Sequence, residues 1–145
     1  MASAADAPLP AVRFLDARGA AQTLEPSAHK LTAIHFWATW CVPCVTELPE
    51  VDKTLKTYAD KGFAVVAISM DGKHVEKVQA FFAEHGITQL TPYFDDKSAA
   101  FQALQIRGLP STVFVDANGK ILKHLHGPVA WDSPQVKAFI EEALK

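Results

Sequence analysis

The hydrophobic residues of this chain follow two spacings, and each spacing predicts a different kind of element. Continuous apolar runs rich in Ile, Val, Phe and Trp predict buried strands at 31–37, 63–69 and 111–115, with a returning strand at 120–126. Apolar residues at helical spacing predict helices at about 41–60, 75–85, 98–104 and 133–144. Pro43 suits the first turn of the first helix, whereas Pro49 should kink that helix about two turns in.

A short β-hairpin is expected ahead of the first buried strand. Residues 12–14 and 21–24 would form its two arms around a turn at 16–19. We interpret residues 1–10 as a flexible lead-in and 11–145 as one domain. Strands that alternate with helices and then close with a hairpin predict an α/β fold, with a mixed central sheet covered by helices on both faces.

Composition and charge narrow the functional classes. The chain has 145 residues, 49% of them hydrophobic, and a formal net charge of −2, so no basic excess points to nucleic acid. Its longest apolar run, 63–68, is much shorter than the roughly 20 residues of a membrane span. The N-terminus lacks the basic start and apolar stretch of a signal peptide, which fits either a natural start or an exported protein after processing.

The two cysteines, Cys41 and Cys44, carry the candidate chemistry. A disulfide between residues so close in sequence cross-links little of the chain, which favours a reactive pair over a structural one. At positions i and i+3 of a helix start they share one face, and the helix N-terminus stabilises a thiolate at Cys41. Cys41 is therefore the expected nucleophile, and Cys44 is expected to resolve the mixed disulfide.

A zinc site is the structural alternative for this pair. It would need two more ligands, and no second cysteine pair follows. His124 and His126 are the candidates, but residues i and i+2 of a strand simply point to the same face. We favour redox chemistry and expect neither a metal nor a cofactor beyond the Cys41–Cys44 disulfide itself.

Longer segments around the cysteines resemble the thioredoxin superfamily. FWATWCVPC (36–44) is similar to its active-site segment, and GLPSTVFVD (108–116) to its second signature, about 65 residues later. VTELP (45–49) resembles the TlpA/ResA branch, which comprises membrane-tethered or periplasmic thiol reductases of bacteria. The resemblance covers about residues 11–145 and implies a thioredoxin fold with an N-terminal β-hairpin extension.

The resemblance also implies how substrates dock. Pro110 should follow a cis peptide bond and face the cysteines, which would expose the Leu109 backbone to an extended substrate segment. Trp40, Val42 and Pro43 beside the nucleophile complete the expected substrate-binding residues.

Two further residues are candidates for tuning the site. Glu47 continues the three-residue step from Cys44, so its carboxylate can raise the thiol pKa values and exchange a proton with Cys44. An exposed helix glutamate is the alternative. His35 occupies a position where thioredoxins carry a buried Asp and TlpA-like chains often Asn. A core histidine and a role in tuning pKa values are both open for it.

Val42 and Pro43 between the cysteines offer no charge or side-chain donor to stabilise a thiolate, which favours a reductant over an oxidant. The resemblance implies a periplasmic rather than cytoplasmic protein, either soluble or anchored to the membrane through a segment absent here. We expect it to be a monomer that receives electrons from a membrane dithiol carrier. Its expected substrates are disulfides of apocytochrome c or of copper-delivery proteins. Alternative functions are a Cu(I)-binding metallochaperone that uses the CxxC pair and a thiol peroxidase.

Overall fold

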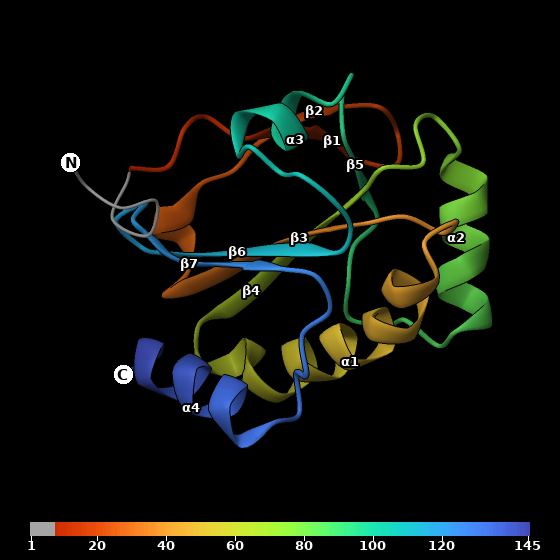
Figure 1. Ribbon diagram of the computed structural model, residues 1–145. Helices are drawn as coiled ribbons and strands as arrows, with labels where there is room; N and C mark the ends of the chain where they lie inside the picture. Colours follow the sequence, from red (N-terminus) through yellow and green to blue (C-terminus); the bar gives the residue numbers. More distant parts are fainter. Residues whose placement is uncertain (1–7) are drawn as a thin grey trace.

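A computed structural model describes residues 8–145 and places seven strands in one mixed sheet (Figure 1). The strands are β1 (Arg13–Leu15), β2 (Ala21–Thr23), β3 (Leu31–Trp37), β4 (Phe63–Ser69), β5 (Tyr93–Phe94), β6 (Ser111–Asp116) and β7 (Ile121–His126). Their order across the sheet is β2-β1-β5-β4-β3-β6-β7. β3 pairs in parallel with β4 and antiparallel with β6, so the predicted mixed sheet is confirmed.

Four α-helices surround the sheet. They are α1 (Val42–Tyr58), α2 (Val75–Glu84), α3 (Ala99–Ala103) and α4 (Pro134–Ala143), and the short 3-10 helices are η2 (Pro26–Ala28) and η3 (Ala59–Lys61). Figure 1 shows α1 and α4 on one face of the sheet and α3 on the other. Within residues 8–145, no helix has the length and apolar character that crossing a membrane requires.

Two apolar clusters, one on each face of the sheet, form the core. Side chains alternate along β3, so Ala33 and Trp37 join the cluster beneath α1 and α4, whereas Ile34 and Phe36 join the cluster beneath α3. His35 lies in the same alternation as Ala33 and Trp37 and therefore faces α1. This placement brings a buried imidazole under the helix that carries the cysteines.

The start of α1 follows the sequence expectation closely. Cys41 is the N-cap residue and Pro43 lies in the first turn, where a missing N–H breaks no helical bond. The helix runs through Pro49 and ends at Tyr58, and the last predicted residues form η3 instead.

Strand β5 was not predicted and corrects the expected element order. It pairs with β4 on one side and, through Phe94 and Leu15, with β1 on the other, so it joins the N-terminal hairpin to the central sheet. Two residues are too few for a period-2 pattern to be visible in a sequence.

The end of the predicted lead-in at 1–10 contacts the sheet. The Leu9 N–H donates to the Gly119 carbonyl at 2.9 Å, and Pro8 forms an isolated bridge with Lys120. Backbone pairing therefore places residues 8–10 beside the β6–β7 turn. The remainder of that prediction, residues 1–7, lies outside the described residues.

Candidate active site

The cysteine pair lies at the N-terminus of α1, as predicted. Cys41 and Cys44 form a disulfide with their Cα atoms 5.3 Å apart. Cys41 retains 8% of its surface, whereas Cys44 is completely buried. The helix dipole and the free N–H groups of the first turn favour negative charge on the Cys41 sulfur once the disulfide is reduced.

Exposed apolar surface surrounds Cys41. Trp40 and Val42 are 64% and 77% exposed and are the large hydrophobic residues that stand out to solvent within residues 8–145. A hollow of about 450 Å³ opens beside them, lined by Trp40, Cys41, Met70, Ser98, Phe101, Gly108 and Leu109. Since none of these lining side chains is charged, the hollow suits an apolar segment of a partner.

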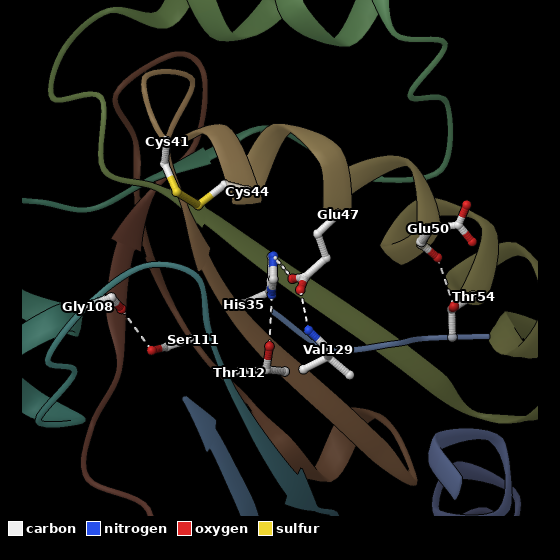
Figure 2. A network of polar contacts seen from close by, with 10 residues as sticks. All are labelled: His35, Cys41, Cys44, Glu47, Glu50, Thr54, Gly108, Ser111, Thr112 and Val129. Atoms are coloured by element: carbon white, nitrogen blue, oxygen red, sulfur yellow. Dashed lines mark hydrogen bonds and ion pairs between the residues drawn. A yellow bond between two sulfur atoms is a disulfide. The ribbon is translucent and has the colours of Figure 1, made fainter. Parts of the chain in front are cut away.

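The loop before β6 forms the wall opposite the cysteines. Its Leu109–Pro110 peptide bond is cis, as the resemblance implied, and Leu109 lines the same hollow as Cys41. The Ser111 hydroxyl donates to the Gly108 carbonyl at 2.8 Å (Figure 2), and the Gly127 N–H donates to the Pro110 carbonyl at 2.9 Å. These two bonds attach the loop to the sheet next to the disulfide.

Glu47 is enclosed in the protein and is not an exposed helix residue. It is 5% exposed, and its Oε2 accepts a hydrogen bond from the Val129 N–H at 2.6 Å. Burial raises the pKa of Glu47 to about 7, against smaller opposing contributions from the Val129 N–H and the Trp131 side chain. A carboxyl with this pKa exchanges its proton near neutral pH.

His35 lies directly beside Glu47 (Figure 2). Its Nε2 is 3.2 Å from Glu47 Oε1, and its Nδ1 is 2.9 Å from the Thr112 hydroxyl on β6. Among residues 8–145, neither Nε2 nor Oε1 has another hydrogen-bond partner, and their mutual contact is less well aligned than a standard hydrogen bond. Complete burial lowers the pKa of His35 to about 3, so the imidazole is neutral at physiological pH.

The structure therefore brings four predicted residues to one place. Cys41, Cys44 and Glu47 lie along α1, and His35 rises toward them from β3 (Figure 2). The arrangement places a buried carboxyl with a raised pKa one helical turn after the buried cysteine.

The histidines considered for a zinc site lie elsewhere. His124 and His126 stack on each other on β7 with ring centroids 4.1 Å apart. They line a hollow that also contains Arg107 and Gln105, not the hollow onto which Cys41 opens. The structure does not bring them together with the cysteines.

Asp71 is a site residue that the sequence reasoning missed. Its buried carboxylate accepts hydrogen bonds from the Thr39 hydroxyl, from the Thr39 N–H at 3.0 Å and from the Ser69 hydroxyl at 2.6 Å. Thr39 precedes Cys41 by two residues, so Asp71 anchors the loop that leads into α1. An acidic residue at the carboxyl end of a predicted strand, next to the strand that leads to the cysteines, was the available signal.

Comparisons with known proteins agree with this geometry. The chain matches the Redoxin family over residues 4–140. It is 35% identical over 100 residues to thiol-disulfide oxidoreductase ResA of Oceanobacillus iheyensis, covering 68% of this chain and 50% of that protein. It is 33% identical over 110 residues to thioredoxin-like protein YneN of Bacillus subtilis, covering 74% and 62%. The chain thus spans about half to two thirds of the length of these curated relatives.

Solved structures share the fold over nearly the whole chain. A Chlorobium tepidum protein provisionally named thiol:disulfide interchange protein DsbE superposes with a TM-score of 0.83, at 27% identity and 97% coverage of both chains. A second C. tepidum structure, of a thioredoxin family protein, has a TM-score of 0.79 at 24% identity and covers 99% of this chain and all of that one. These likenesses confirm the thioredoxin fold.

Proposed function

This chain belongs to the Redoxin family as a TlpA/ResA-like member of the thioredoxin superfamily, and from that premise we propose that it is a thiol–disulfide oxidoreductase that reduces disulfides in other proteins. One observation carries the proposal. The Cys41–Cys44 disulfide caps the start of α1, with Cys41 opening onto an uncharged hollow and Cys44 buried behind it. A sulfur that partners can reach, backed by one that they cannot, is the arrangement that disulfide exchange requires.

The reaction begins from the dithiol form. The Cys41 thiolate attacks one sulfur of a substrate disulfide, which forms a mixed disulfide and releases the other substrate sulfur as a thiolate that takes up a proton. Cys44 then loses its proton and attacks Cys41 Sγ, which forms the enzyme disulfide and breaks the bond to the substrate. The second substrate sulfur leaves as a thiolate and takes up a proton. Two electrons pass from the enzyme to the substrate, which leaves as a dithiol.

Glu47 is the proton acceptor for Cys44 in this scheme. It lies one helical turn after Cys44 on α1, and burial raises its pKa to about 7, so at neutral pH both of its protonation states are populated. Its negative charge also disfavours thiolates nearby. Together with the uncharged Val42 and Pro43, this supports a reductant, because a weakly stabilised thiolate gives up its electrons more readily.

Residues at the rim of the hollow beside Cys41 would bind the substrate. Trp40, Val42 and Pro43 would contact the partner beside the nucleophile, and the Leu109 backbone ahead of Pro110 would pair with an extended segment. The exposure of Trp40 and Val42 supports this assignment, since large apolar side chains in solvent often mark a contact surface.

The finer assignment follows the TlpA/ResA resemblance. It gives apocytochrome c or copper-delivery proteins as substrates, a membrane dithiol carrier as electron donor, and a monomer acting in the periplasm. The relatives named thiol-disulfide oxidoreductase ResA support the oxidoreductase class on which this assignment builds.

Trapping with Cys44→Ser tests the proposal directly. Without the resolving thiol, the mixed disulfide between Cys41 and its substrate should accumulate in a periplasmic extract, where mass spectrometry identifies the partner. Cys41→Ser is the matched control and should trap nothing. Partners trapped by Cys41→Ser but not by Cys44→Ser would reverse the roles of the cysteines, and wild-type protein unable to reduce insulin would refute the function.

A further inference from the structure

The contacts of His35 determine which of its two ring nitrogens carries the proton. A neutral imidazole carries one N–H, so one ring nitrogen donates and the other accepts. Nε2 faces Glu47 Oε1 and Nδ1 faces the Thr112 hydroxyl, and His35 is completely buried with a pKa lowered by burial. Which ring nitrogen carries the proton therefore depends on whether the Glu47 carboxyl is ionised or protonated.

Two arrangements give each ring nitrogen of His35 a role that matches the atom it faces. When Glu47 is ionised, Nε2–H donates to Oε1, and the Thr112 hydroxyl donates to the bare Nδ1. When Glu47 is protonated on Oε1, that O–H donates to the bare Nε2, and Nδ1–H donates to the Thr112 oxygen. A hydroxyl fits both arrangements because it can donate and accept.

We propose that Glu47, His35 and Thr112 form one proton-coupled unit, in which each change in the protonation of Glu47 moves the His35 proton between its two nitrogens and reverses the hydrogen bond to Thr112. Thr112 and His35 are then positioning residues that act on the cysteines through Glu47. The part of this inference that concerns Cys44 rests on the proposed function, whereas the coupling itself does not.

The remaining neighbours of Glu47 are a backbone N–H, a tryptophan and the cysteine pair. The Val129 N–H and the Trp131 side chain reach it from the segment between β7 and α4, and the cysteine pair precedes it on α1. Trp131 also meets the His35 ring edge-on, with centroids 6.1 Å apart. His35 can therefore respond to protonation of Glu47 by moving its own proton from one ring nitrogen to the other. The imidazole stays neutral throughout, so no imidazolium is buried in the core.

Nitrogen NMR of the oxidised protein tests the coupling. The two ring ¹⁵N shifts of His35 identify which nitrogen carries the proton, and the ¹³C shift of the Glu47 carboxyl follows its ionisation. Between about pH 5.5 and about pH 8.5 the proton should move from Nδ1 to Nε2, with the midpoint of the Glu47 titration. In Glu47→Gln the tautomer should not change with pH. A fixed tautomer in the wild type, or a pH-dependent one in Glu47→Gln, would overturn the proposal.

Two variants of Thr112 test its place in the unit. Thr112→Val leaves Nδ1 without a partner, and a buried unpaired N–H is less tolerated than an unpaired acceptor. The state with Glu47 protonated is therefore penalised more, and both midpoints should fall by about one pH unit. Thr112→Ser keeps the hydroxyl and should keep the wild-type midpoints. If folded Thr112→Val has the same two midpoints as the wild type, Thr112 is not part of the unit.

Insulin reduction by the same samples separates this inference from the proposed function. Reductase activity with a fixed tautomer would overturn the coupling alone. A tautomer that follows Glu47 in a protein without reductase activity would leave the coupling intact and refute the proposed function.

Discussion

Asp71 holds Thr39 by both its backbone N–H and its hydroxyl, although the two residues are 32 positions apart in sequence. The same carboxylate accepts from Ser69, whose hydroxyl in turn accepts the N–H of Asp71. These bonds join the end of β4 to the loop after β3. Since that loop leads through Trp40 to Cys41, a buried carboxylate supports the position of the nucleophile.

Replacing Asp71 should therefore affect both stability and activity. Asp71→Asn turns one acceptor oxygen into a donor that faces a donor, which should lower the free energy of unfolding by about 1–3 kcal/mol. The rate of insulin reduction should fall too, because the loop before Cys41 loses its anchor. Urea denaturation measures the first effect, and Asp60→Asn, at an exposed position, is the control. Wild-type values for Asp71→Asn would show that the network does not support the loop.

Glu47 predicts an unusual pH dependence of stability. Its pKa rises from 4.5 to about 7 on folding because of burial, so between these values the folded state binds more protons than the unfolded state. Ionised Glu47 thus destabilises the fold, and stability is lost as pH rises from about 4.5 to 7. Glu47→Gln removes this loss, so relative to wild type it should gain on the order of 3 kcal/mol between about pH 4.5 and pH 8.

Urea denaturation at both pH values measures that gain. Glu50→Gln, on the same helix at a partly exposed position, is the matched control and should follow the wild type at both ends. A constant difference between Glu47→Gln and wild type would mean that Glu47 is ionised equally easily in both states.

The lowered pKa of His35 predicts that folding stability decreases as the pH falls, the opposite of the effect of Glu47. Burial lowers its pKa from 6.5 to about 3, so the unfolded state binds more protons in that window and stability falls as pH decreases through it. Compared with His35→Asn, wild type should lose about 2–3 kcal/mol more between about pH 7 and pH 4.5. Carboxylates that do not contact His35 cancel in this comparison, and making it in a Glu47→Gln background removes the carboxylate that does. His29→Asn, at an exposed position, should show no such difference from wild type.

A variant of Trp40 can distinguish the binding of a protein partner from the chemistry at the sulfurs. Trp40→Ala removes an exposed ring beside Cys41, and loss of its contact with a partner should lower kcat/KM for a protein disulfide by about tenfold. A small-molecule disulfide has no surface to contact Trp40, so its rate constant should stay near the wild-type value. Equal losses with both substrates would instead place Trp40 in the chemistry at Cys41.

The sequence was most informative where chemistry and local pattern coincide. β3 and β4 have the predicted bounds because each is a continuous apolar run, and Cys41 lies at the start of α1, as its N-cap residue. The step of three from Cys44 put Glu47 on the correct face of the helix. What that step could not show was the contact of Glu47 with His35, since the two side chains meet only when α1 packs on the sheet.

Other parts of the site depend on contacts that local patterns do not encode. Asp71 meets Thr39 only because β3 and β4 are adjacent in the sheet. Val129 reaches Glu47 across 82 residues of sequence, from a segment with no regular structure. Periodicity describes the face of a single element, so such partners become visible only in the folded chain.

The bond from Val129 to Glu47 gives the protein an internal reporter. An amide proton that donates to a carboxylate resonates at a different frequency from one that donates to the neutral acid, so the Val129 signal should move as Glu47 gains or loses its proton. Val129 lies in the segment before α4 and is not among the residues that line the hollow beside Cys41. One backbone resonance can thus follow the charge inside the protein during turnover, with the docking surface left unlabelled.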